Sequence, residues 1–307
     1  MFRKLRHANL TRCSPIDYSN SLSVASAINY DIGEGPIWHP SSNKLIFVDC
    51  NLGYIHQLDP TSGVITKYEV GETIGVALPC KSGGFVVTSK GGLLSYDEKN
   101  QTSLLVPIES SLPSNRMNDG KCDSLGRLWS GTFSSTFERG AGSLYRIDPD
   151  LSVTKVVSEV RVSNGIAWNQ SETLMYFNDT LSSGIDVFDY DITHGTISNR
   201  RRFVDIERKQ GLPDGLTVDI EGCVWVALFY GSEVRRYNPQ GHLVGVVKLP
   251  TSRVTSCNFG GTDLTDLYIT TADFKINDDG FPHEPEAGYV FKCNPGVSGL
   301  PSYPFGR

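Results

Sequence analysis

The chain lacks the features that mark membrane-spanning, helical and nucleic-acid-binding proteins. No apolar run reaches the length that crosses a bilayer, and no apolar stripe at helical spacing continues over three turns. The net charge is −6 and no basic stripe is visible, so we expect neither a nucleic acid nor a membrane as a partner. The N-terminus has no apolar signal segment, which favours a cytoplasmic protein over a secreted one.

Cysteine and histidine are too scattered to suggest a zinc site. None of the seven cysteines forms a Cys-x-x-Cys pair, and the six histidines lack ligand spacing. We therefore expect reduced, mostly buried thiols. A Gly-x-Ser-x-Gly elbow and a phosphate-binding loop are also missing. The segment from Lys275 to Glu286 has EF-hand offsets, but Lys275 takes the place of the first carboxylate, so we interpret it as a surface loop.

What the chain does contain is a repeat. Six short apolar strands start 40, 43, 47, 49 and 43 residues apart, and each is followed by a second element that begins with Gly. The strands cover residues 45–49, 85–88, 128–132, 175–179, 224–227 and 267–270. This period predicts an all-β fold, a six-bladed β-propeller with about four strands per blade, rather than a two-sheet sandwich. We expect the propeller over residues 26–307 and a flexible tail over residues 1–25.

Four turns are each preceded, five residues earlier, by one oxygen-bearing side chain. The pairs are Glu34 and His39, Asn118 and Asp123, Asn164 and Asn169, and Asp214 and Asp219. Any one of these side chains alone would be interpreted as a turn cap. Glu is a poor turn former, however, and the shared register makes all four converge if the repeats surround an axis. Two carboxylates and two amides are hard oxygen ligands, so the repeat predicts a calcium-like metal site in the axial channel.

Three neighbours of these motifs receive structural interpretations. Asp119 lies beside Gly120, and we expect it to be a turn residue. Trp38 and Trp168 each follow a site residue by four positions, and we expect them to pack between blades.

At these motifs the chain resembles the regucalcin/gluconolactonase family, which includes luciferin-regenerating enzyme. The motifs are Gly-Glu-Gly-Pro at 33–36, Arg-x-Asn-Asp-Gly-Lys at 116–121, Ser-Asn-Gly at 163–165 and Pro-Asp-Gly at 213–215. The resemblance implies a six-bladed propeller with one divalent ion in the axial channel. It implies Glu34, Asn164 and Asp214 as metal ligands, and Arg116 and Asn118 as substrate contacts.

The activity that the resemblance implies is metal-dependent opening of a sugar lactone. We expect Ca²⁺ as the ion, with Zn²⁺, Mn²⁺ and Mg²⁺ as alternatives. Asp214 is the candidate general base, and Arg116 the candidate group for stabilising a tetrahedral intermediate. The chain departs from the family where regucalcins place acidic residues, because here residues 131–136 read Gly-Thr-Phe-Ser-Ser-Thr. Glu138 follows, and we expect it to be an exposed loop residue.

Two other functions stay open at this point. The protein could be a calcium-binding regulatory protein with residual lactonase activity, although the intact pair of Arg116 and Asn118 argues against a pure regulator. It could also be a metal-dependent hydrolase of another substrate, such as an organophosphate or a luciferin-related nitrile. We expect a monomer or a weak dimer that acts on a small molecule.

Overall fold

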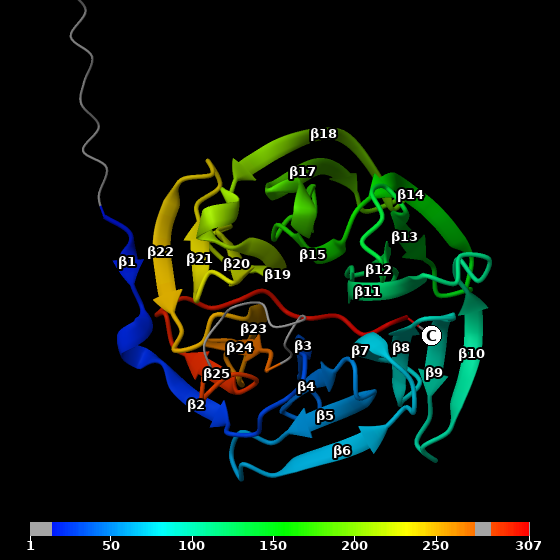
Figure 1. Ribbon diagram of the computed structural model, residues 1–307, viewed down its shortest axis with the longest axis horizontal. Coiled ribbons are helices and arrows are strands. Elements are labelled where there is room, and N and C mark those ends of the chain that lie inside the picture. The colour runs from blue at the N-terminus through cyan, green and yellow to red at the C-terminus, as the bar shows by residue number, and fades with distance from the viewer. Residues whose placement is uncertain (1–13, 274–283, 307) are drawn as a thin grey trace, which may run out of the picture.

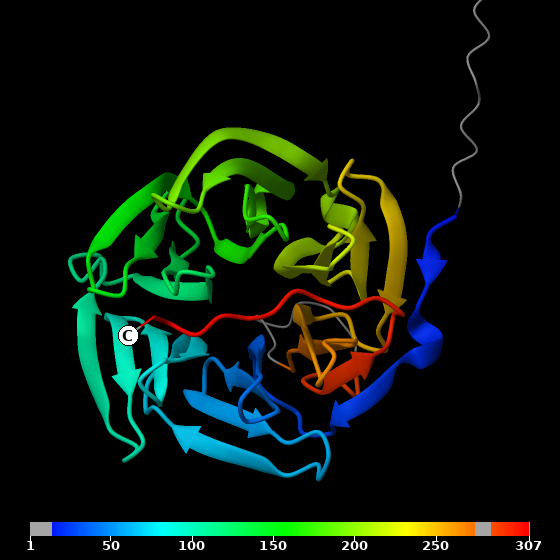
Figure 2. The same ribbon diagram turned by 180° about the vertical axis from the view of Figure 1, so that it is seen from behind.

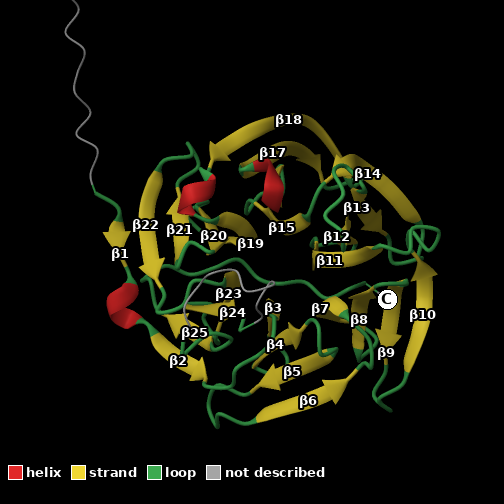
Figure 3. Ribbon diagram, in the orientation of Figure 1, coloured by secondary structure: helices red, strands yellow, loops and turns green. Residues whose placement is uncertain are grey.

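A computed structural model describes residues 14–273 and 284–306, and in these ranges 25 strands form six sheets around a central axis (Figure 1). The helices in the described chain are three 3₁₀ turns, η1 (Ser19–Ser21), η2 (Thr180–Ser182) and η3 (Arg208–Gln210) (Figure 3). The prediction of an all-β, six-bladed propeller is confirmed.

Each blade runs outward from an inner strand at the axis to an outermost strand at the rim. The inner strands are β3 (Gly33–His39), β7 (Ile74–Pro79), β11 (Asn115–Cys122), β15 (Ser163–Trp168), β19 (Leu212–Val218) and β23 (Val254–Gly260). The second strands are β4 (Lys44–Asp49), β8 (Phe85–Ser89), β12 (Leu128–Ser134), β16 (Leu174–Asp179), β20 (Val224–Phe229) and β24 (Asp266–Thr271). These second strands match the six that the period predicted.

The outer half of each blade follows the same order. The third strands are β5 (Tyr54–Leu58), β9 (Gly92–Tyr96), β13 (Gly142–Ile147), β17 (Gly184–Asp191), β21 (Glu233–Tyr237) and β25 (Val290–Cys293). The outermost strands of the first five blades are β6 (Ile65–Glu69), β10 (Thr102–Pro107), β14 (Val153–Val160), β18 (Thr196–Asp205) and β22 (Leu243–Lys248).

The sixth blade takes its outermost strand from the other end of the chain. β2 (Ser23–Ser26) pairs antiparallel with β25, and β1 (Ile16–Asp17) pairs parallel with β22 of the fifth blade. The boundary expected at residue 26 is therefore too late, because the chain is hydrogen-bonded to two blades from Ile16 onward. Both segments are too short and too polar to stand out against a period of forty residues. Residues 1–13 lie outside the described chain.

The spaces between blades are filled by apolar side chains, as sheets stacked face to face require. Trp38 on β3 stacks on Tyr268 of β24, with ring centroids 6.1 Å apart and an interplanar angle of 12°. Trp168 on β15 meets Trp129 of β12 edge to face at 6.2 Å. Both tryptophans join neighbouring blades, which confirms their predicted packing role.

The C-terminal segment crosses the centre of the ring, as the red trace in Figures 1 and 2 shows. Gly299 bridges to Asp219 of the fifth blade, and Phe305 bridges to Cys80 of the second. Asp219 and Cys80 both follow the C-terminal ends of inner strands, so this segment covers that end of the axial channel. The opposite end, where the inner strands begin, is the end that contains the predicted site.

Candidate metal centre and substrate pocket

Every inner strand contains a bulge near its beginning. Pairing with the second strand shifts register between Glu34 and Ile37, Ile74 and Ala77, Met117 and Gly120, Ser163 and Ile166, Pro213 and Leu216, and Val254 and Ser256. A bulge adds one residue to one strand and changes the direction of the side chains there. The predicted site residues lie at or beside four of these bulges, which explains why they point to the axis.

The five predicted site residues line one cavity of about 370 Å³. Glu34 comes from β3, Arg116 and Asn118 from β11, Asn164 from β15 and Asp214 from β19. Four blades therefore contribute to one pocket, as the shared register of the motifs predicted. Thr255 on β23 also lines this pocket, whereas Gly75, at the equivalent place on β7, does not.

Hydrogen bonds fix the two amide side chains, that of Asn118 to the next blade and that of Asn164 within its own blade. Asn118 donates its Nδ2 to the Ser163 carbonyl oxygen at 2.9 Å, and Asn164 donates its Nδ2 to the Thr180 hydroxyl at 3.1 Å. The backbone of Asp214 is held by Asn178, which donates to its carbonyl oxygen at 2.5 Å. These hydrogen bonds engage the amide nitrogens, and Asn164 Oδ1 is left without a hydrogen-bond partner.

Two aspartates at the ends of second strands fix where the inner strands begin. Asp49 on β4 accepts hydrogen bonds from the backbone nitrogens of Asp31 and Ile32, just before Glu34. Asp179 on β16 accepts the equivalent pair from residues 161 and 162, just before Asn164. The same pair of hydrogen bonds therefore occurs in two blades, and the sequence motifs did not indicate it.

The two carboxylates of the pocket oppose each other electrostatically. Burial, reinforced by the negative charge of Asp119, raises the pKa of Glu34 to about 8. Burial and the negative charge of Glu34 raise the pKa of Asp214 well above its ordinary value. Their side chains are within hydrogen-bonding reach of each other. In the absence of a cation, therefore, the pair holds protons that ordinary carboxylates would have released.

These residues fit a divalent cation. Asn164 Oδ1 and Asp214 Oδ1 are buried without a hydrogen-bond partner, and such oxygens are costly unless a ligand compensates them. A cation would also remove the repulsion between the two carboxylates. Within residues 14–273 and 284–306 no group of three or more His, Cys, Asp or Glu side chains could hold a metal. The candidate site is not a group of that kind, because it combines only two carboxylates, Glu34 and Asp214, with the amide of Asn164.

Asp119 differs from its predicted role. It lies in the bulge of β11 rather than in a turn, and its Oδ1 accepts a hydrogen bond from Gly120 N at 2.7 Å. With Lys121 it lines the narrow interior of the channel below the pocket. Burial raises the pKa of Asp119 and lowers the pKa of Lys121. The motif contained both residues, but sequence alone did not indicate that a bulge turns Asp119 toward the axis.

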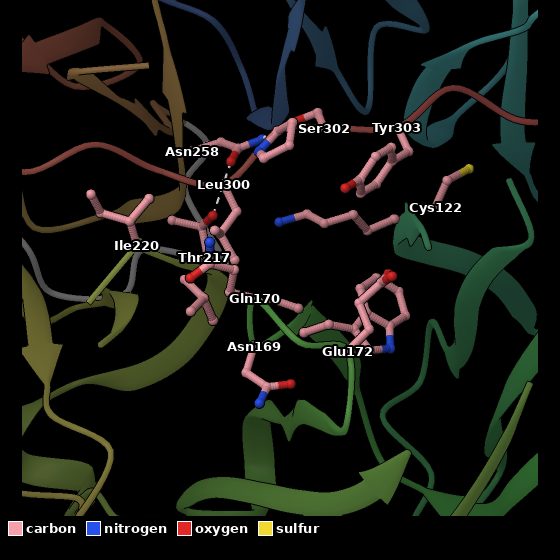
Figure 4. Close-up of a pocket in the computed structure, with 15 residues that line it drawn as sticks. Cys122, Asn169, Gln170, Glu172, Thr217, Ile220, Asn258, Leu300, Ser302 and Tyr303 are labelled. Carbon is pink, nitrogen blue, oxygen red and sulfur yellow. Dashed lines mark hydrogen bonds between the residues drawn. The ribbon is translucent and has the colours of Figure 1, made fainter. Parts of the chain in front are cut away.

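A second cavity of about 270 Å³ lies at the other end of the channel, beneath the C-terminal segment (Figure 4). Thr217 and Asn258 meet there through a hydrogen bond of 3.0 Å, drawn as a dashed line. Lys121 also lines this cavity, where its Nζ donates to the Leu216 carbonyl oxygen at 3.0 Å. Lys121 therefore lines both the narrow interior of the channel and this second cavity, and the predicted metal ligands lie at the other end.

Several further expectations can be compared with the structure. Cys50, Cys122, Cys223, Cys257 and Cys293 are buried thiols, as expected. Glu138 is exposed and does not line the pocket, also as expected. The EF-hand-like segment lies largely outside the described residues. In the part of the chain that is described, no helix is long and apolar enough to cross a membrane.

Residues 32–273 match the family model described as SMP-30/Gluconolactonase/LRE-like region. Regucalcin from Bos taurus is 36% identical over 285 residues, which cover 90% of this chain and 95% of that protein. Regucalcin from Gallus gallus is 36% identical over 296 residues, covering 94% and 99%. The chain belongs to the SMP-30/gluconolactonase/LRE-like family, and the resemblance seen in its motifs is confirmed.

Solved structures agree with this assignment. A luciferin-regenerating enzyme superposes with a TM-score of 0.89 at 30% identity, covering 93% of this chain and 99% of that one. A calcium-binding protein, regucalcin, from Agrobacterium tumefaciens superposes with a TM-score of 0.88 at 26% identity, covering 95% and 99%. A gluconolactonase from Xanthomonas campestris, at 20% identity and a TM-score of 0.73, shares the fold.

Proposed function

We propose that this protein is a divalent-metal-dependent lactonase. The observation that supports the proposal most directly is the convergence of Glu34, Asn164 and Asp214 beside Arg116 and Asn118 in one pocket. Glu34, Asn164 and Asp214 would hold the cation, Ca²⁺ being favoured because all three supply oxygen. When bound, the cation supplies Lewis-acid polarisation of the lactone carbonyl and stabilises negative charge that develops on its oxygen.

The side chains of the pocket have the remaining roles in the reaction, which are proton transfer, charge stabilisation and orientation of the substrate. Asp214 accepts a proton from the attacking water as that water adds to the carbonyl carbon. Arg116 stabilises the negative charge of the tetrahedral intermediate, from a position over the Phe133 ring with 4.5 Å between its Cζ and the ring centroid. The carbon–oxygen bond of the ring breaks, the leaving oxygen takes the proton from Asp214, and a hydroxy acid is released. Asn118 orients the substrate.

Sugar lactones are the substrate class that the family resemblance supports, so D-glucono-1,5-lactone is the reference substrate. We expect metal-stripped protein to be inactive in a pH-indicator assay, and added Ca²⁺, Zn²⁺, Mn²⁺ or Mg²⁺ to restore acid release in a measurable order. Glu34→Gln should lose this activity. Glu98 is exposed in the turn between β9 and β10 of the second blade and does not line the pocket. Glu98→Gln is therefore the control, and it should keep the activity.

If the protein is instead a calcium-binding regulatory protein, we expect it to bind Ca²⁺ without opening lactones. A relative that superposes closely is described as a calcium-binding protein, which favours this second candidate. Tight calcium binding without turnover of any lactone would support it and would refute the lactonase. Turnover of a phosphotriester or of a luciferin-related compound, with none of lactones, would instead indicate a different hydrolase. A cytoplasmic location and a monomeric or weakly dimeric state remain part of the proposal.

A further inference from the structure

The mouth of the pocket is lined mainly by apolar side chains, with Asn51 and Ser135 as its exposed polar groups. Five apolar side chains line it: Ile32, Phe133, Phe137, Val162 and Phe229. Two of them precede inner strands, two lie at the ends of second strands, and Phe137 lies in the turn after β12. The metal-binding residues come from the inner strands themselves. A substrate whose reacting carbonyl faces the base therefore directs its ring substituent against these apolar groups.

Phe137 is held in an unusual conformation at this mouth. It has a positive φ of 54°, which is uncommon for an aromatic residue, and it is 48% exposed. Its backbone nitrogen donates to the Ser134 carbonyl oxygen at 2.7 Å, which closes a tight turn after β12. Single exposed apolar residues are common, but one held at a positive φ over a pocket is not.

The aromatic groups form a continuous stack. Phe137 lies 5.9 Å from Phe133, centroid to centroid, with an interplanar angle of 29°. Arg116 lies on the Phe133 ring. The stack thus runs from the residue that we place beside the reacting carbonyl to the solvent. Its length and flatness suit an alkyl chain or an aromatic ring.

Several polar side chains of the pocket already have partners within the protein, and Ser135 supplies an exposed hydroxyl beside them. The Thr255 hydroxyl donates to the Gly33 carbonyl oxygen at 2.6 Å, and the Asn51 amide donates to Asp31 at 2.7 Å. The Thr180 hydroxyl accepts from Asn164. A sugar lactone that entered this mouth would find partners for only some of its hydroxyl groups, and the others would lose water without compensation, which is unfavourable.

We propose that the preferred substrate is a lactone whose ring carries an apolar alkyl or aryl substituent, and that Phe133 and Phe137 contact this substituent. The inference rests on the proposed lactonase function and specifies the substrate class of the same site. Hydrolysis of glucono-1,5-lactone is then measurable but slower.

Two six-membered lactones test the substituent directly, because δ-decanolactone and D-glucono-1,5-lactone share the ring and differ outside it. With metal-loaded protein, and after subtraction of the spontaneous rates, we expect kcat/KM to favour δ-decanolactone by about tenfold or more. Phe137→Ala should reduce that preference severalfold by slowing δ-decanolactone. Leu104→Ala removes a similarly exposed apolar side chain from β10, far from the pocket, and should leave the preference unchanged.

Binding of inert analogues separates this inference from the proposed function. 6-Pentylpiperidin-2-one, the lactam of δ-decanolactone, and D-glucono-1,5-lactam can be compared by calorimetry. Tighter binding of the pentyl lactam, weakened in Phe137→Ala, would support the apolar mouth. It would do so even if neither lactone were opened, and that lack of turnover would overturn only the lactonase function. Faster turnover of gluconolactone together with tighter binding of its lactam would overturn the apolar preference and leave the lactonase in place.

Discussion

Asp214 has two roles in the proposed reaction, as a metal ligand and as a proton acceptor, and one substitution separates them. Asp214→Asn keeps an oxygen that can bind the cation but removes the base. At saturating metal we therefore expect kcat to fall by about 10²–10⁴-fold, the usual contribution of a general base. Circular dichroism should show an unchanged fold. Asp263→Asn, at an exposed position, is the matched control. Recovery of kcat in excess metal would show that Asp214 is a ligand only.

The pKa of Glu34 predicts how the affinity for the metal depends on pH. Its pKa is about 8 in the protein without a cation, so at pH 6–7 the metal must displace a proton. Affinity should therefore rise from pH 6 to pH 9, and proton release on binding should shrink over the same range. Calorimetry in buffers with different ionisation enthalpies measures both quantities. Glu34→Gln should weaken binding and flatten its pH dependence, although Asp214 still contributes. Constant affinity between pH 6 and pH 9 would contradict this account.

The bulge of β3 links strand geometry to the site. Gly35 has a φ of +55°, and a Cβ added there would lie 2.7 Å from Val76 Cγ2 in the next blade. Gly35→Ala should thus destabilise the fold by about 1–2 kcal/mol or more and displace Glu34, which weakens metal binding. Gly71 also has a positive φ, +86°, but open space around it. Gly71→Ala therefore shows the backbone cost alone, and its metal affinity should match the wild type. Equal metal affinity in both variants would exclude the bulge as a determinant of the site.

These elements also show what the sequence could and could not predict. The six second strands are apolar runs at a regular period, so they were predicted nearly to the residue. Glu34, Asn118, Asn164 and Asp214 occupy one register position, and rotational symmetry alone converts that into a shared pocket. Asp119 was placed in a turn because a bulge has no reliable sequence signature.

The pocket walls were harder to anticipate for a different reason. Phe229 and Val162 come from adjacent blades and line the same pocket only once these blades are assembled. Neither belongs to a motif, and each alone looks like an ordinary strand residue. β2 was missed because a four-residue strand at one end of the chain has no neighbouring repeat to define its phase.

Closure of the ring connects the N-terminal segment to the site. β2 pairs with β25 through Ser23 and Lys292, Val24 and Phe291, and Ser26 and Val290. On the inner side of the same blade, the Thr255 hydroxyl donates to the Gly33 carbonyl oxygen of the first blade. An open sixth blade would therefore loosen the strand that presents Glu34, in addition to exposing the edge of β25.

This connection predicts different effects for two truncations. A chain that begins at residue 27 loses β1 and β2, and we expect its Tm to fall by roughly 5 °C or more. Its metal affinity should fall as well, and amide exchange should increase in Val290–Cys293. A chain that begins at residue 14 keeps both strands and should match the full-length protein. If both truncated chains have the same Tm and the same metal affinity, packing such as that of Trp38 on Tyr268 is enough to close the ring, and β2 is dispensable.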